Sequence, residues 1–148
     1  MSAQEEEVLD SPVDWVNKHV RAIVDSGGTK GIRRWGVDIL LLTTRGRKSG
    51  TLRRTALIYG EDQGRYLLVA SSGGSRNHPE WYLNLVANPE VELQVGPETF
   101  TARARTATAG EKPRLWRQMA SIWPDYDKYQ TRTKREIPLV IVERSPET

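Results

Sequence analysis

The chain of 148 residues contains no cysteine and only one phenylalanine, two methionines and two histidines. The absence of cysteine excludes disulfide bonds, thiolate metal sites and cysteine nucleophiles. The two histidines, His19 and His78, lie far apart in the sequence and on different expected helices. We therefore expect no bound metal and no histidine-based catalytic triad.

Long apolar runs are missing as well. No stretch approaches the roughly 20 apolar residues that span a bilayer, and the N-terminus lacks the charged-then-apolar order of a signal peptide. We expect a cytoplasmic protein, and an amphipathic N-terminal helix leaves open a peripheral contact with the inner face of the membrane. The length favours one domain, with residues 1–10 as a flexible tail and residues 11–148 as the folded unit.

Charge is concentrated in one segment, although the formal net charge is only +3. Five of the ten residues at 45–54 are cationic, and two glycines interrupt them directly after the apolar run 39–42. Guanidinium groups, hydroxyls and backbone N–H groups close together favour an anion pocket. The segment lacks P-loop spacing, so a phosphorylated ligand is expected without nucleotide hydrolysis. A solvated surface loop is the alternative. Nucleic acid ranks lower, because no basic stripe continues elsewhere.

Hydrophobic periodicity predicts a mixed α+β fold. A helix is expected after a cap at Asp10 or Ser11, with Pro12 in its first turn and a stop at Gly27-Gly28. Strands are expected at 37–45, 52–60, 65–71, 90–96, 98–108 and 137–143, and helices at 78–87 and from about 111 to 124. Residues 61–64 predict a hairpin between the second and third strands. So many hairpins with few helices favour an antiparallel barrel with helices outside it or across its ends.

Two further segments are candidates for a ligand site. Ala70, Ser71 and Ser72 end a strand before a glycine pair and a helix start, an order that suits a flat ring against backbone N–H groups. An ordinary strand-to-helix loop is the alternative, and Trp81 and Tyr82 fit the core better than a ligand contact.

Aromatic residues recur every third position near the C-terminus. Trp123, Tyr126 and Tyr129 would line one side of a short helical turn and form an aromatic wall. Tyrosine hydroxyls in such a wall would orient or protonate a substrate. Capping of the barrel mouth is the equal alternative.

Several of these blocks, in this order, resemble the deazaflavin-dependent nitroreductase family of actinobacteria. The resemblance covers residues 36–143 and includes residues 43–50, 70–74, 78–85 and 126–130, followed by Ile137-Pro138. It implies a split β-barrel of the flavin-reductase, FMN-binding type with flanking helices. It also implies coenzyme F420 as the cofactor, and reduction of quinones such as menaquinone, of nitroaromatics and of activated olefins.

The resemblance also assigns roles to residues. The cofactor contacts it implies are Arg47, Lys48, Ser49, Gly50, Arg53, Ala56, Leu57, Ala70, Ser71, Ser72 and Trp81. Trp123, Tyr126 and Tyr129 match the substrate wall, and Tyr126, Tyr129 and Ser71 are the hydroxyls expected to act on the developing oxyanion.

Three positions depart from the family pattern. Ala56 stands where many members have proline, Ser72 where some have lysine, and Trp123 where the nitroreductase has tyrosine. The second departure removes a cation from the cofactor site, and the third alters the substrate wall. Two other functions stay open: a non-catalytic deazaflavin carrier, and an FMN-binding oxidase or flavin reductase. The assembly is expected to be a monomer or a homodimer.

Overall fold

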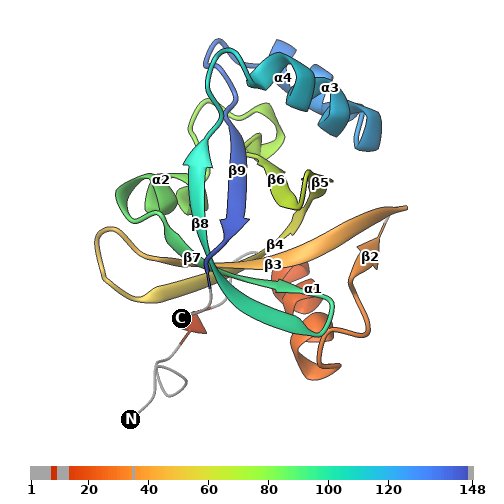
Figure 1. Cartoon of the computed structure of the whole chain (residues 1–148), viewed down its shortest axis with the longest axis vertical. Coiled ribbons are helices and arrows are strands. Elements are labelled where there is room, and N and C mark those ends of the chain that lie inside the picture. Colours follow the sequence, from red (N-terminus) through yellow and green to blue (C-terminus); the bar gives the residue numbers. More distant parts are fainter. Residues whose placement is uncertain (1–7, 10–13, 35, 147–148) are drawn as a thin grey trace.

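The structure is a computed structural model that describes residues 8–9, 14–34 and 36–146 (Figure 1). The strands in these ranges are β1 (Val8–Leu9), β2 (Arg33–Arg34), β3 (Val37–Arg45), β4 (Leu52–Ile58), β5 (Gly60–Asp62), β6 (Arg65–Val69), β7 (Glu90–Val95), β8 (Glu98–Thr106) and β9 (Leu139–Arg144). The helices are α1 (Asp14–Asp25), α2 (Glu80–Ala87), α3 (Lys112–Ile122) and α4 (Asp125–Thr131), with a 3₁₀ turn, η2, at Ser72–Gly74.

The strands form one curled sheet in the order β1-β4-β3-β7-β8-β9-β6-β5, with β2 paired to β3. All neighbours are antiparallel except β1 and β4. In the part of the chain that is described, no ladder joins β4 to β6. The barrel is therefore left open between these two strands.

The central strand β3 is buried on both faces, which explains its unbroken apolar run. Leu40 and Leu42 pack with Leu68 and Leu93 inside the barrel. On the other face Ile39 and Leu41 pack in a separate cluster that includes residues of α1.

Helix α1 rests its apolar face on the sheet. Val20 and Ile23 are fully buried there, whereas Lys18 and Arg21 are exposed. The helix ends in a Schellman motif, in which Gly28 N–H donates to Ile23 O over 2.8 Å and Gly27 N–H donates to Val24 O over 3.1 Å. The expected cap at Asp10 or Ser11 and Pro12 lie outside the described residues. No described helix has the length and apolar character needed to cross a membrane.

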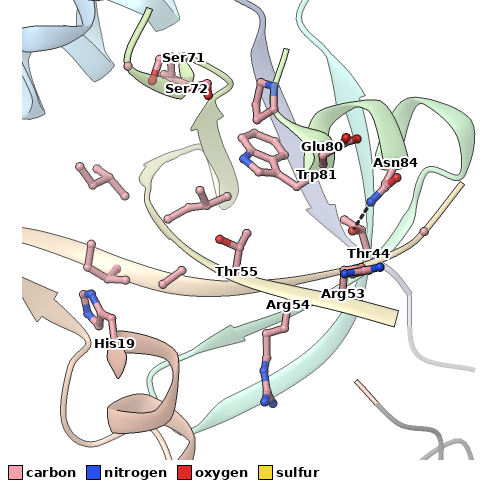
Figure 2. A pocket seen from close by; sticks show the side chains of 18 of the residues that line it. His19, Thr44, Arg53, Arg54, Thr55, Ser71, Ser72, Glu80, Trp81 and Asn84 are labelled. Atoms are coloured by element: carbon pink, nitrogen blue, oxygen red, sulfur yellow. Dashed lines mark hydrogen bonds between the residues drawn. The ribbon is translucent and has the colours of Figure 1, made fainter. Parts of the chain in front are cut away.

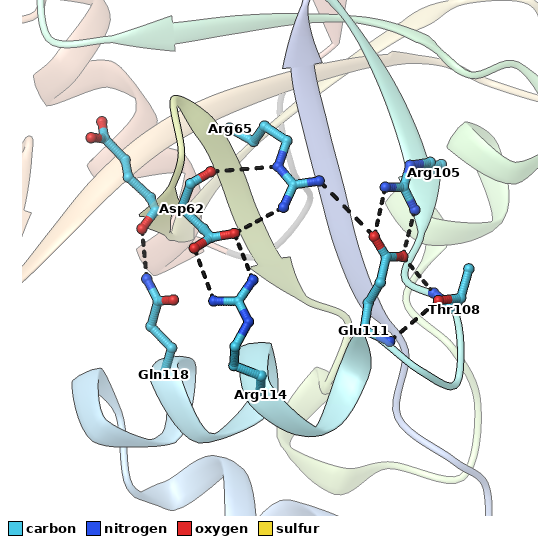
Figure 3. A network of polar contacts seen from close by, with 8 residues as sticks. Asp62, Arg65, Arg105, Thr108, Glu111, Arg114 and Gln118 are labelled. Carbon is cyan, nitrogen blue, oxygen red and sulfur yellow. Dashed lines mark hydrogen bonds and ion pairs between the residues drawn. The ribbon is translucent and has the colours of Figure 1, made fainter.

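Helices α3 and α4 lie together at one end of the barrel (Figure 1). An ionic network attaches α3 to the β5–β6 hairpin and to β8 (Figure 3). Asp62 accepts hydrogen bonds from Arg114 (3.0 Å) and Arg65 (2.8 Å), and these guanidinium groups lower the pKa of the Asp62 carboxyl to about 2. Glu111 binds Arg105 through two hydrogen bonds of 2.7 and 2.9 Å. These contacts fix α3 to β5 and β6 on the one hand and to β8 on the other.

The predicted strand 37–45 agrees with β3, and the predicted hairpin turn at 61–64 is confirmed between β5 and β6. The predicted single strand 52–60 is wrong. The chain leaves β4 at Ile58, so β4 pairs with β3, while the separate strand β5 pairs with β6. The break occurs at Gly60, which is buried beneath α3, where a Cβ would come within 2.7 Å of Met119 Sδ. Packing under α3 therefore overrides the propensity for one long strand. The residues expected to form a tail include Val8–Leu9, which pair with Leu52 and Arg53.

The end of α1 yields a test of packing. Gly28 has φ +86°, and a Cβ there would overlap the carbonyl oxygen of Gly96 on the β7–β8 turn. Gly28→Ala should therefore lower the free energy of unfolding by about 2–4 kcal/mol, measured by urea denaturation. Gly27→Ala is the matched control, because Gly27 has φ +66° but open space around it, and it should cost only about 1 kcal/mol. Equal effects of the two substitutions would contradict the packing argument.

Candidate functional site

A cavity of about 880 Å³ lies at the opening of the barrel (Figure 2). Its walls come from β4, the loop after β6, the start of α2, the α3–α4 region and α1. Figure 2 shows Arg53 and Asn84 at one end, His19 at the other, and Trp81 near the turn that carries Ser71 and Ser72. The unpaired interval between β4 and β6 therefore contains an elongated pocket.

The basic turn forms one end of this pocket. Arg47, Lys48 and Arg53 line it, and Lys48 and Arg53 are exposed. Arg53 lies beside Thr44 and Asn84, whereas the neighbouring Arg54 points away from them, as strand alternation requires (Figure 2). Arg53 is exposed, so its end of the cavity opens to solvent. This end can accept an anion without the cost of full charge burial.

Arg47 is tied to α2. Its Nη1 donates to Glu80 Oε2 over 2.6 Å and to Asn84 Oδ1 over 3.0 Å, and its backbone N–H donates to the same Asn84 oxygen over 3.1 Å. Asn84 is buried and also donates to Thr44 Oγ1 over 3.4 Å. Asn84 and Glu80 carry no local signal in the sequence, because their contacts join residues more than 30 positions apart.

The loop after β6 turns with an unusual backbone. Ser71 is right-handed, Ser72 has φ +45°, and Gly73 and Gly74 also have positive φ. A right-handed residue followed by a left-handed one turns successive N–H groups toward one side, as in anion-binding nests. Ser71, Ser72 and Gly73 all line the cavity. This wall can thus offer hydrogen-bond donors to the edge of a flat ligand.

Gly74 brings this loop against α4. Its φ is +80°, and a Cβ there would lie 2.5 Å from Tyr129 O and 3.0 Å from Tyr129 Cα. Only glycine fits this approach. The loop and the aromatic wall are therefore in direct backbone contact.

Arg135 fixes the same loop from behind. Its guanidinium donates to the carbonyls of Ala70 (3.2 Å), Ser71 (2.7 Å) and Ser75 (2.8 Å), and its Nη1 lies 2.9 Å from His78 Nδ1. Burial, followed by the Arg135 charge, lowers the pKa of His78. His78 therefore accepts this hydrogen bond as a neutral imidazole.

Trp123, Tyr126 and Tyr129 all line the cavity, and helix α4, which carries the two tyrosines, lies away from the β3–β4 turn (Figure 1). Trp123 Nε1–H donates to Tyr129 Oη over 3.4 Å, which leaves the Tyr129 proton for another acceptor. Tyr126, on α4, is only 5 % exposed and packs in a core cluster with Leu115 and Met119 of α3. Burial raises its pKa well above the ordinary value, so its hydroxyl stays protonated at neutral pH.

The structure brings together most of the residues that the sequence singled out. Those that line the cavity are Arg47, Lys48, Ser49, Arg53, Ala56, Leu57, Ser71, Ser72, Trp81, Trp123, Tyr126 and Tyr129. Gly50 and Ala70 do not line it. Tyr82 and Leu85 are buried in the core, whereas Trp81 is half-buried and lines the cavity.

His19 was not assigned a role, yet it lines the cavity from α1, with Nε2 2.6 Å from Gly31 O. Its position on an amphipathic helix gave no signal of this. Across the described residues, no group of three or more His, Cys, Asp or Glu side chains could hold a metal ion.

The arrangement suits a long ligand with an anionic end and a flat, largely apolar body. Cations line the end at Arg53, and the Ser71–Ser72 turn forms a side (Figure 2). Trp123, Tyr126 and Tyr129 add aromatic rings to the lining. Trp81, Ala56 and Leu57 supply apolar surface between them. No nucleophile with an adjacent base is present among the lining residues, so the site is built to bind and orient reactants.

Sequence comparison identifies relatives of the chain. A sequence model described as F420H(2)-dependent quinone reductase matches residues 15–144. An F420H(2)-dependent quinone reductase of Mycobacterium tuberculosis is 43% identical over 108 residues, which cover 71% of this chain and 72% of the relative.

Solved structures agree with the sequence relatives. An F420-H2 dependent reductase, FDR-A, is 42% identical, with a TM-score of 0.66 over 71% of this chain and 93% of that one. A structure described as a domain-swapped dimer is 40% identical, with a TM-score of 0.68 over 90% of this chain and all of that one. With the sheet order above, these neighbours confirm the predicted split barrel in the α+β class.

The contact between His78 and Arg135 yields a pH test. Because the folded state lowers the pKa of His78, its contribution to stability is complete above the unfolded pKa of about 6.5 and is lost as the pH falls below that value. The wild-type melting temperature should thus fall between pH 7.5 and 5.5. His78→Gln retains an oxygen acceptor and should flatten this dependence. The low pKa of Asp62 keeps it ionised across the window. Equal slopes for both proteins would refute the assignment.

Proposed function

Because this chain belongs to the F420H(2)-dependent quinone reductase family, we propose that its cavity binds the reduced cofactor and a quinone side by side for hydride transfer. The chain is an oxidoreductase, and coenzyme F420 is the cofactor of its family. The observation that carries the proposal is the continuity of the cavity from the basic turn to the aromatic wall.

The residues present fit a deazaflavin with an anionic tail. The cavity of about 880 Å³ falls within the range of cofactor pockets. Arg47, Lys48 and Arg53 would hold the phosphate and the acidic tail, which can extend into solvent at this open end. Ala56, Leu57 and Trp81 would enclose the ring, while the backbone N–H groups of the Ser71–Ser72 turn would meet its polar edge.

When bound, the reduced deazaflavin supplies the hydride, so the protein needs no covalent catalyst. The chain's own residues position the acceptor and exclude water. Contact between correctly oriented reactants removes much of the entropic barrier. Trp123 holds the hydroxyl oxygen of Tyr129, so that the Tyr129 proton can be donated to the quinone oxygen as negative charge develops there. Tyr126, neutral and buried, supports this wall from the core.

For the acceptor, we propose a menaquinone-like quinone. The aromatic wall of Trp123 and Tyr129 suits the stacking of a flat bicyclic ring. Nitroaromatics and activated olefins would occupy the same wall, since both accept a hydride while charge develops on oxygen. The exposed Lys18 and Arg21 on α1 would allow a peripheral contact with an anionic membrane surface that holds a lipid quinone.

Two alternatives are distinguished by one experiment. The purified protein is titrated side by side with coenzyme F420 and with FMN, and the reduced complex is then mixed with menadione. Selective F420 binding followed by oxidation of the reduced cofactor by menadione supports the proposal. F420 binding without oxidation would indicate a carrier, and preferential FMN binding would indicate a flavin enzyme.

For the assembly, we propose a homodimer in solution alongside the monomer. The support is the 40% identical structure described as a domain-swapped dimer. Light scattering after size exclusion, measured over a range of concentrations, would reveal the dimer. A monomer at every concentration would reject it.

The cationic end yields a binding prediction. Arg53→Ala should weaken F420 binding by about tenfold or more, because a charge-assisted hydrogen bond contributes roughly 1.5–3 kcal/mol. Fluorescence quenching of the cofactor gives the dissociation constant. Arg103→Ala is the matched control, since Arg103 is exposed on β8 and does not line the cavity. A dissociation constant that Arg53→Ala leaves unchanged would remove the assignment.

The aromatic wall yields a kinetic prediction. Tyr129→Phe should lower kcat with menadione by about 10²-fold, the lower range for general acid catalysis, while F420 affinity persists. The ring, and hence its packing against the loop, is kept in this variant. Equal loss of turnover and of cofactor affinity would show that Tyr129 is structural.

A further inference from the structure

Arg135 combines a full charge with exclusively neutral partners. Its guanidinium contacts three backbone carbonyls and the imidazole of His78. No carboxylate among the described residues forms an ion pair with it, and the adjacent Glu136 pairs with Lys112 over 3.1 Å instead. Burial lowers the pKa of Arg135, yet an arginine remains protonated at any physiological pH. The positive charge behind the loop is therefore not neutralised by a carboxylate.

This charge also sets the direction of the loop's peptide groups. In a trans peptide, C=O and N–H point in opposite directions. The carbonyls of Ala70 and Ser71 face Arg135, so the N–H groups of Ser71 and Ser72, which belong to the same two peptide units, face away from it. Ser71 and Ser72 line the cavity, whereas Arg135 does not. Both peptide dipoles thus present their positive ends on the cavity side.

The cation and the two dipoles act in the same sense. All three raise the electrostatic potential at the wall made by Ser71 and Ser72, in a partly buried site where water screens poorly. His78, the imidazole that contacts Arg135, does not bring a negative charge close to this potential. Its other ring neighbour is the neutral side chain of Tyr82, 5.0 Å away, whose hydroxyl is hydrogen-bonded to Thr106. The wall is therefore electropositive although neither Ser71 nor Ser72 carries a charge.

We propose that Arg135 is a positioning residue that makes the Ser71–Ser72 wall electropositive, so that the site favours the anionic form of the heterocycle bound against it. This inference rests on the proposed function, since the heterocycle is the deazaflavin ring. A residue with a purely structural role would hold the loop in place but would not change the protonation of a ligand.

The test is a pH titration of the absorbance of oxidised coenzyme F420, free and bound to the protein. The midpoint of proton loss should be lower for the bound cofactor than for the free one. Arg135→Gln keeps amide donors but removes the charge, and it should raise the bound midpoint by about one pH unit, a tenfold change in the proton equilibrium. Arg135→Lys keeps the charge and should stay near the wild-type midpoint. Arg117→Gln, at an exposed position on α3, is the charge-matched control.

The outcomes are distinct. Failure of the wild-type protein to bind F420 would refute the proposed function itself. Binding with a midpoint equal to or above that of the free cofactor would overturn the inference without any variant, even if Arg135→Gln fails to fold. The inference would also be overturned if Arg135→Gln and Arg135→Lys changed the midpoint of the bound cofactor equally, or if Arg135→Gln changed it no more than Arg117→Gln does. Arg135 would then have only a structural role in holding the loop.

Discussion

The missing ladder between β4 and β6 is the constraint on which the rest of the site depends. Each backbone group released by an open barrel must find another partner, because buried unpaired groups are costly. At the end of β6, Ala70 N–H reaches Pro138 O. Beyond that point the Arg135 guanidinium binds the carbonyls of Ala70 and Ser71. These contacts hold the loop that lines the cavity at the open interval.

The cationic end and the aromatic wall of the cavity offer different interactions to a ligand. Its cationic end is exposed and can gain affinity from a charged tail. Its aromatic wall is carried by α4 and the preceding Trp123, where Tyr126 is in the core and Trp123 donates a hydrogen bond to Tyr129. In the proposed function, affinity gained far from the reacting atoms would position the ring, and the Tyr129 hydroxyl would act only as charge develops. The ionic network around Asp62 and Glu111 keeps α3 fixed to the sheet.

Local patterns in the sequence predicted elements that depend on local forces. The run 37–45 is a strand because both of its faces are buried, and Gly27-Gly28 ends α1 through backbone hydrogen bonds alone. Most of the residues that the family resemblance implied as ligand contacts line the cavity. The resemblance did not indicate Asn84, Glu80 or Arg135, whose contacts span 33 to 65 positions and arise only when the barrel curls. The break in the predicted strand 52–60 was missed for a similar reason, since the space above Gly60 is set by Met119.

The contact of Gly74 with the backbone of Tyr129 has a consequence for engineering. Because the loop after β6 and the aromatic wall touch without side chains between them, neither can be exchanged between homologues alone. A new wall transplanted onto this scaffold would bring its own backbone path and displace the turn beside it. The smallest transferable cassette therefore comprises both segments and the arginine that clamps them, residues 70–78 together with 123–135.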